Sequence, residues 1–174
     1  LLLNLAIGKF AGTEFIFSEI PKHVLSGLVD AGLIIHEAQI SFGNEFRKIL
    51  DLGRWWHDTT NGMPVPLGIN VISKRSLTVE EIIKFDELFR NSIKFGLEHL
   101  EDAIEYSMQF GRGNPKSLIE KFVKMYVNDF TIDMGEEGRN SIIALLQNAK
   151  RNNILSYDDL LFIDSNGKKI QRYS

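Results

Sequence analysis

The sequence has no cysteine, and this absence removes several classes of function at once. None of the 174 residues is Cys, which excludes a disulfide framework, a thiolate nucleophile and a zinc or iron–sulfur site built on Cys. A chain without Cys suits a reducing compartment, so we expect a cytoplasmic location. A chain of this length buries roughly 70% of its unfolded surface and needs no disulfide or metal for stability.

The sequence also lacks a strong excess of charge and a long hydrophobic run. Its formal net charge is -3, and Lys and Arg are spread along the chain, so we expect no nucleic acid partner. The apolar start LLLNLAIG has neither the basic flank nor the cleavage site of a signal peptide. It is also too short to span a bilayer, so we expect no membrane partner.

Three well-known catalytic motifs and two metal-binding patterns are missing as well. The sequence contains no GxGxxG, no GxSxG and no GxxxxGK[ST], which disfavours nucleotide-dependent enzymes and serine hydrolases. No two His have the i, i+4 spacing of a helical metal site. The acidic residues between 129 and 137 lack the ligand spacing of a calcium loop, so we expect no metal.

The first part of the chain, residues 1–73, has the pattern of a parallel α/β lobe. A helix is predicted over 1–9, and the apolar run 14–17 predicts a strand. Ser18 and Gly27 are placed to begin and end a helix over 19–26. The run AGLIIH, residues 31–36, is typical of a strand buried on both faces. These elements predict a right-handed βαβ unit.

The pattern of the lobe continues to residue 73. A short strand is expected in the run ILDLG, followed by a helix that ends at Asn61–Gly62. The β-branched run 67–73 predicts another interior strand.

The second part, residues 74–154, is predicted to be helical, and residues 155–174 form a tail. Helices are expected near 78–94, 97–109, 116–128 and 135–150, with breaks at Gly96 and in the runs 111–115 and 128–135. Thr78 with Glu81, and Asp133 with Glu136, have the spacing of capping boxes. These helices need an apolar partner surface, which we expect from a second sheet. The tail is expected to form a hairpin around Asn166–Gly167 or a loose end.

His36 is the strongest candidate for chemistry because it ends the predicted strand 31–36. Ligands of parallel α/β sheets bind beyond the carboxyl ends of the strands, where an imidazole can accept or give a proton near neutrality. The alternative is that His36 only hydrogen-bonds a neighbouring loop. Gln39 shares the face of His36 if the strand continues, which makes it a candidate substrate contact, whereas Glu37 points to the other face.

The aromatic pair Trp55 and Trp56 is expected to serve packing. A helix of this kind usually buries one Trp and leaves the other at the rim.

Three segments together carry a family resemblance. VDAGLIIHEAQISF (29–42), DLGRWWHDTTNGMPVPLGINVI (51–72) and YVNDFTIDMGEEGR (126–139) resemble, in order and spacing, the 1,4-dihydroxy-6-naphthoate synthases of the futalosine route to menaquinone. The resemblance covers roughly residues 1–150. The combination is specific, although each segment alone is weak.

The resemblance implies a two-lobed fold like that of type II periplasmic binding proteins, used as a lyase. The family converts cyclic dehypoxanthinyl futalosine, a small molecule, to 1,4-dihydroxy-6-naphthoate by breaking carbon–carbon bonds, without a metal or organic cofactor. By resemblance His36 is the general base. Ile35, Leu67 and Gly68 match positions that line the family's cleft.

The chain departs from the family in length. It begins at Leu1, without Met, inside a predicted helix, and it lacks the stretch that builds the sheet of the family's first lobe. We therefore expect a fragment whose cleft has one wall and which is inactive alone. The oligomeric state is not indicated by the sequence.

Two other functions stay open from the sequence. A chorismate dehydratase shares fold and pathway, but its corresponding strand ends in Gly-Asp instead of His36–Glu37. A solute-binding or scaffold domain would keep the fold without chemistry.

Overall fold

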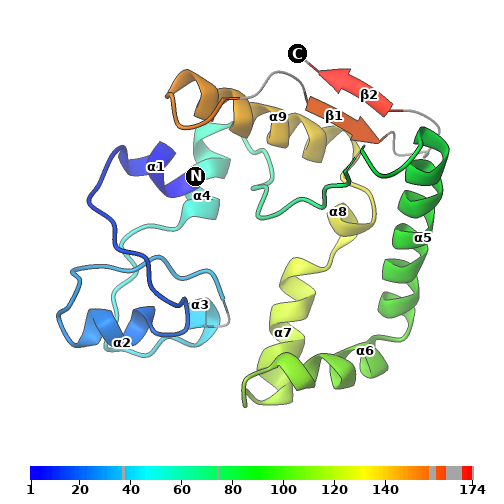
Figure 1. The fold of residues 1–174 in the computed structure, drawn as a ribbon. Helices are drawn as coiled ribbons and strands as arrows, with labels where there is room; N and C mark the ends of the chain where they lie inside the picture. The colour runs from blue at the N-terminus through cyan, green and yellow to red at the C-terminus, as the bar shows by residue number, and fades with distance from the viewer. Residues whose placement is uncertain (37, 74, 157–159, 164–169, 174) are drawn as a thin grey trace.

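The computed structural model describes residues 1–36, 38–73, 75–156, 160–163 and 170–173. Most of these residues are helical or irregular, and two short strands lie near the C-terminus (Figure 1). The helices are α1 Leu2–Ile7, α2 Ile20–Leu25, α3 Ala38–Ser41, α4 Leu52–Thr59, α5 Val79–Glu98, α6 Leu100–Ser107, α7 Lys116–Tyr126, α8 Asp129–Ile132 and α9 Gly135–Arg151, with a 3₁₀ turn at Met108–Phe110.

The helices follow the predicted ones closely, and local signals explain their ends. At the start of α5 the Thr78 hydroxyl accepts the Glu81 N–H at 3.3 Å, while the Glu81 carboxylate accepts the Thr78 N–H at 2.8 Å, so this capping box is confirmed. The helix α4 begins where the Asp51 carboxylate accepts the Arg54 N–H at 3.1 Å. As predicted, it ends just before Asn61 and Gly62, which both have positive φ (56° and 97°).

Four details of the helix predictions are wrong. Residue Glu19, without a side-chain bond, precedes α2 in place of Ser18. The helix α5 passes through Gly96 to Glu98, because a Gly inside a long helix costs only about 1 kcal/mol relative to Ala. The Asp133 carboxylate accepts the Gly135 N–H at 2.8 Å, and no capping box with Glu136 forms. The short helix α8 lies where a break was expected.

The strands predicted for residues 1–73 are absent from the described part of this segment, which leaves out only residue 37. Residues 14–16, 31–35 and 67–73 have neither helix nor strand structure. Leu33 is 42% exposed and Ile35 58% exposed, although the run 31–36 was predicted to be buried on both faces. A strand exists only through hydrogen bonds to a neighbour, and these segments do not pair with one another. The parallel sheet of the predicted lobe is therefore not formed in this structure.

The strands that do form belong to the C-terminal hairpin. β1 Leu160–Ile163 pairs antiparallel with β2 Ile170–Tyr173, with Leu160 opposite Tyr173 and Ile163 opposite Ile170. The hairpin alternative for the tail is thus confirmed, and the chain combines helices with a small sheet. The predicted turn at Asn166–Gly167 lies outside the described residues.

The extended segment 31–35 packs closely on α2. A Cβ atom on Gly32 would lie 2.3 Å from Cγ2 of Ile20 and 3.1 Å from Cγ2 of Val24. Only Gly allows this approach, because real side-chain atoms do not come so near each other. The contact fixes the path of the chain that leads to His36.

Buried, hydrogen-bonded side chains join α4 to α9. Trp56, Ser141 and Ala149 are each at most 1% exposed. The Trp56 indole N–H donates to the Ser141 hydroxyl at 3.0 Å and to the Pro64 carbonyl at 3.1 Å, and Ser141 donates to the same carbonyl at 2.5 Å. A buried polar group is stable when it is bonded in this way. Ile142 and Leu145, three positions apart on α9, are buried as well.

The molecule exposes a large surface that includes many large hydrophobic side chains. The structure exposes 12528 Å², whereas a folded monomer of 19.8 kDa exposes about 8,600 Å². Large hydrophobic side chains on α5, including Phe85 (50% exposed), Leu88 (68%) and Phe95 (62%), contribute to the excess. Figure 1 shows α5, α6 and α7 forming an open arc beside the lobe of α1–α4, with α9 across the top. No helix in the described ranges combines the length and apolar character of a membrane span.

Candidate functional site

His36 stands at the end of the extended segment 31–35, and main-chain groups hold both nitrogens of its ring. Nε2 lies 2.9 Å from the Phe17 carbonyl oxygen, and the Ala38 N–H donates to Nδ1 at 3.2 Å. The rings of Phe17 and His36 are tilted against each other with centroids 5.1 Å apart. His36 is half-buried.

These two contacts determine the tautomer of the imidazole. A carbonyl oxygen can only accept a hydrogen bond, so Nε2 carries the proton. Nδ1 then holds the lone pair, which accepts the Ala38 N–H. The ring does hydrogen-bond a neighbouring segment, as the alternative interpretation of the sequence requires. Its role as a base stays a prediction.

Gln39 lies beside His36 for a different reason from the one predicted. The chain does not stay extended; it turns after His36, with the Gln39 N–H donating to the His36 carbonyl at 2.9 Å, and α3 begins at Ala38. The Gln39 amide donates through Nε2 to the Tyr126 hydroxyl at 2.9 Å. Gln39 thus faces α7. Glu37 lies outside the described residues.

The other sequence candidates are not brought together around His36. Ile35 is its neighbour and is 58% exposed. Leu67 is 60% exposed, and a Cβ atom on Gly68 would have no other atom within 4 Å. Their segment joins α4 to α5 beside α9, whereas α3 lies beside α7 (Figure 1). The cleft-lining role of Ile35, Leu67 and Gly68 stays a prediction.

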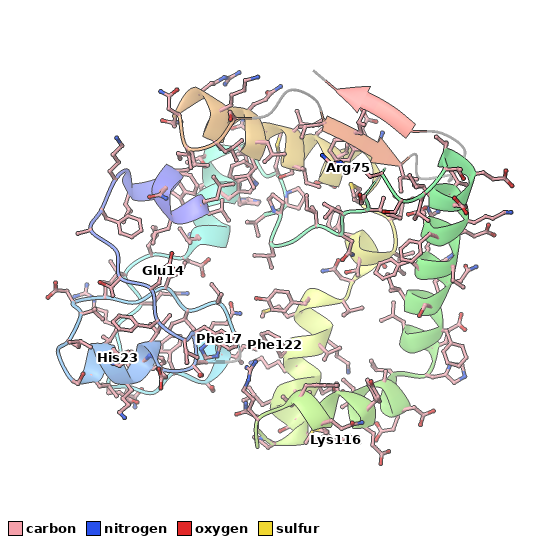
Figure 2. All side chains as sticks on the ribbon, in the orientation of Figure 1. Glu14, Phe17, His23, Arg75, Lys116 and Phe122 are labelled. Carbon is pink, nitrogen blue, oxygen red and sulfur yellow. The ribbon has the colours of Figure 1, made fainter. Side chains whose placement is uncertain are left out.

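Three residues near His36 were not predicted from the sequence: Phe17, Arg112 and Tyr126. The Arg112 guanidinium carbon lies 4.6 Å from the centroid of the Phe17 ring, a cation–π contact. Arg112 has a φ of 50°, in the turn that precedes α7. Figure 2 shows Phe17 on the side of its lobe that faces α7 and Phe122. One signal was present in the sequence, since Tyr126 is the first residue of the third family-like segment.

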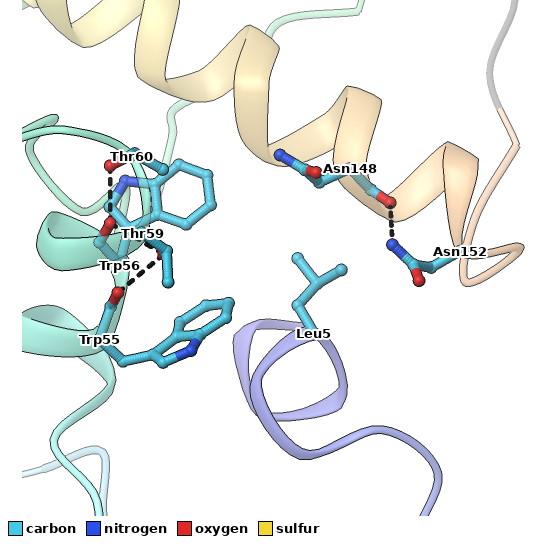
Figure 3. Close-up of a pocket in the computed structure, with 7 residues that line it drawn as sticks. All are labelled: Leu5, Trp55, Trp56, Thr59, Thr60, Asn148 and Asn152. Carbon is cyan, nitrogen blue, oxygen red and sulfur yellow. Dashed lines mark hydrogen bonds between the residues drawn. The ribbon is translucent and has the colours of Figure 1, made fainter.

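A separate cavity of about 140 Å³ lies between α1, α4 and α9 (Figure 3). Its hydroxyl and amide donors are used inside their own helices: Thr59 and Thr60 donate to the carbonyls of Trp55 and Trp56, and Asn152 donates to that of Asn148. Trp56 is buried and Trp55 half-buried, so the packing role predicted for this pair is confirmed. His36 does not line this cavity.

The ionisable groups of the described segments do not form a metal site. No group of three or more His, Asp or Glu side chains in these segments is placed to hold a metal ion. The Asp51 carboxylate, at the start of α4, is stabilised in its charged form by its neighbours. The bond from the Arg54 N–H, helped by the Lys48 ammonium, lowers the pKa of Asp51 below its usual value.

Comparison with known proteins places the chain in a family. A sequence profile of the family described as "Menaquinone biosynthesis" matches residues 1–151. The chain belongs to this family. Two curated relatives named 1,4-dihydroxy-6-naphtoate synthase share 35% identity over 150 residues, in Thermus thermophilus, and 36% over 134 residues, in Streptomyces coelicolor. The resemblance seen in the sequence is thereby confirmed.

A solved structure shares the fold of this menaquinone biosynthesis family member. A crystal structure of a protein from Archaeoglobus fulgidus matches with a TM-score of 0.82 and 37% identity, over 88% of this chain and 58% of that one. The two synthases are matched over 86% and 76% of this chain but only 54% and 47% of their own lengths. The chain therefore spans about half the length of its curated relatives.

Proposed function

We propose that this chain supplies the His36 wall of a 1,4-dihydroxy-6-naphthoate synthase. In this proposal the complete site is a lyase that converts cyclic dehypoxanthinyl futalosine to 1,4-dihydroxy-6-naphthoate. The observation that carries the proposal is the identity of 35% over 150 residues with a synthase of that name. The geometry of His36 supports it, because Nδ1 accepts a main-chain N–H and so presents a lone pair, the feature that a base needs.

The proposed role of His36 is that of general base through Nδ1. The lone pair on Nδ1 accepts the Ala38 N–H in this structure, so Ala38 must move aside before Nδ1 takes a proton from the substrate. The Phe17 carbonyl can keep its bond to Nε2–H throughout, since Nε2 is protonated in both states of the ring. This carbonyl would hold the ring in place and stabilise the imidazolium that forms.

The proposal includes a second wall and a two-lobed, periplasmic-binding-protein-like fold. The exposed apolar side chains of α5 and of the segment 31–35 support it, because exposed patches of this kind mark contact surfaces. The share of the relatives' length that the chain spans also agrees with it. A small-molecule substrate, a cofactor-free reaction and a cytoplasmic location belong to the same proposal.

The activity can be tested with a chimaera. Residues 1–174 are joined to the part of the Thermus thermophilus synthase that they do not span, and the purified protein is incubated with cyclic dehypoxanthinyl futalosine or with chorismate. We expect 1,4-dihydroxy-6-naphthoate from the first substrate and no reaction of the second. Dehydration of chorismate instead would assign the sibling activity. Tight binding without any product would assign a binding protein.

A further inference from the structure

Tyr126, the last residue of α7, is held in a fixed position beside the His36 segment. Its ring packs against Phe122 with centroids 4.6 Å apart and planes tilted by 45°. Its carbonyl oxygen accepts the Thr131 hydroxyl at 3.0 Å. The side chain is half-buried. The phenol is therefore placed by packing on one side and by the start of α8 on the other.

The phenol oxygen of Tyr126 receives a hydrogen bond instead of giving one. The Gln39 amide donates to this oxygen at 2.9 Å, across 87 positions of sequence. A tyrosine hydroxyl both accepts and donates. In the described part of the chain its own hydrogen has no acceptor, so the O–H is available to a ligand.

Two contacts connect α7, or the turn that precedes it, with the immediate surroundings of His36. Gln39, which bonds Tyr126, also bonds the His36 carbonyl through its N–H at 2.9 Å. At the other end of α7, Arg112 lies over the ring of Phe17, whose carbonyl bonds His36 Nε2. The 11 residues of α7 span about 16 Å. Because the two contacts lie at opposite ends of α7, they determine both the orientation of α7 and its distance from the segment that carries His36.

We propose that Tyr126 is a substrate-binding residue of the His36 site, whose phenol O–H donates a hydrogen bond to a substrate oxygen while Gln39 holds the phenol oxygen in place. This inference rests on the proposed function. The relatives' name specifies a dihydroxynaphthoate product, whose hydroxyl and carboxylate oxygens all accept hydrogen bonds. Tyr126 is the phenol that the structure brings to Gln39, beside His36.

The test uses the full 174-residue chain and the product 1,4-dihydroxy-6-naphthoate, kept free of oxygen, as the probe. Binding is followed by NMR of the histidine imidazoles at probe concentrations into the millimolar range. A response of His36 without one of exposed His57 locates binding at the site. Tyr126→Phe removes only the hydroxyl, and Tyr106→Phe is the matched control. Tyr106 is 64% exposed on α6 and also contacts a Phe ring, that of Phe110.

We expect Tyr126→Phe to raise the Kd for the product about 3- to 10-fold, the effect of one neutral hydrogen bond. Tyr106→Phe should bind like the wild type. Gln39→Leu should raise the Kd less than Tyr126→Phe, because the phenol remains. Adding Gln39→Leu to Tyr126→Phe should change little further. Circular dichroism and the unfolding midpoint of each variant check that the fold is kept.

The outcomes separate this inference from the function it rests on. Wild-type binding at His36 with an unchanged Kd in Tyr126→Phe overturns the role of Tyr126 and leaves the proposed function standing. If Tyr126→Phe unfolds, an unchanged Kd in Gln39→Leu has the same meaning. A wild-type chain that does not bind the product overturns the role of Tyr126 in this chain, while turnover by the chimaera decides the proposed function separately.

Discussion

Two regions of the molecule, the α4–α9 contact and the segment 11–50, differ sharply in how they are held. The first buries Trp56, Ser141 and Ala149 around a closed set of hydrogen bonds. The second has no buried residue among those described, 11–36 and 38–50. His36 lies in the second region, positioned by two main-chain groups and by the contacts of its neighbours with α7.

The difference places the buried core of this chain outside the segment that carries His36, the proposed base. Helices on an apolar core keep their shape through local bonds and burial. An extended segment has no such internal hydrogen bonds, so its conformation depends on contacts with neighbouring segments. We therefore expect substitutions in the first region to change global unfolding and substitutions in the second to change local opening.

The largest effect on stability is expected from Trp56→Ala. Removing a buried aromatic side chain leaves a cavity and typically costs about 3–5 kcal/mol, and here it also leaves the Ser141 hydroxyl and the Pro64 carbonyl with one donor fewer. Urea denaturation followed by circular dichroism measures the loss. Trp55→Ala, at the half-buried neighbour, is the control and should cost much less. Equal losses of stability in the two variants would contradict the conclusion that burial of Trp56, and not of Trp55, stabilises the fold.

Gly32→Ala tests the second region. The new Cβ atom would lie 2.3 Å from Ile20, and relieving such a clash costs about 1–3 kcal/mol. We expect faster amide exchange in residues 20–36, with the urea midpoint of the α4–α9 region nearly unchanged. The matched control is Gly68→Ala, where the added atom meets nothing within 4 Å. A large fall in global stability would show that the two regions unfold as one.

Thr78→Ala tests the capping box at the start of α5, which acts within a few residues. Loss of the hydroxyl that accepts the Glu81 N–H should cost about 1 kcal/mol. The bonds from Thr78 also lower the pKa of Glu81, so this pKa should rise in the variant, which NMR titration of the carboxylate can follow. Thr13→Ala, at an exposed residue outside any helix, should change neither quantity.

The smallest expected effect is a pH dependence from Asp51. The Arg54 N–H lowers its pKa in the folded state, so the stabilisation is present above the unfolded value of about 3.9 and is lost as pH falls through the folded pKa. Because the carboxylate is mostly exposed, the effect should stay below about 1 kcal/mol. Denaturation of wild type and Asp51→Asn at pH 7 and pH 3 should show a smaller decrease in the variant. An identical decrease would assign the acid sensitivity to other groups.

The helices could be predicted from the sequence because their signals are local. Two such signals are the capping pair Thr78 and Glu81 and the Asn61–Gly62 end of α4, which act within a few residues. The predicted strand 31–36 failed because pairing depends on a partner outside the run itself. Apolar composition predicts that Leu33 and Ile35 favour burial but does not determine what buries them.

The candidate site likewise contains residues that local sequence predicts and residues that it does not. His36 and Gln39 could be proposed from one short segment, although the chain turns between them and the Gln39 side chain bonds Tyr126. The residues that orient them could not: Phe17 precedes His36 by 19 positions, and Tyr126 follows Gln39 by 87. Neither of these two contacts produces a periodic pattern of residues from which it could be predicted.

The central claim is that His36 is the general base, and the turnover of His36→Asn in the chimaera tests it most directly. Asn keeps much of the hydrogen-bonding capacity of the ring but cannot accept the catalytic proton. We predict a kcat lowered by roughly 10²–10⁴-fold, with folding unchanged and His57→Asn as active as the wild type. Formation of 1,4-dihydroxy-6-naphthoate by His36→Asn at the wild-type rate would contradict the account.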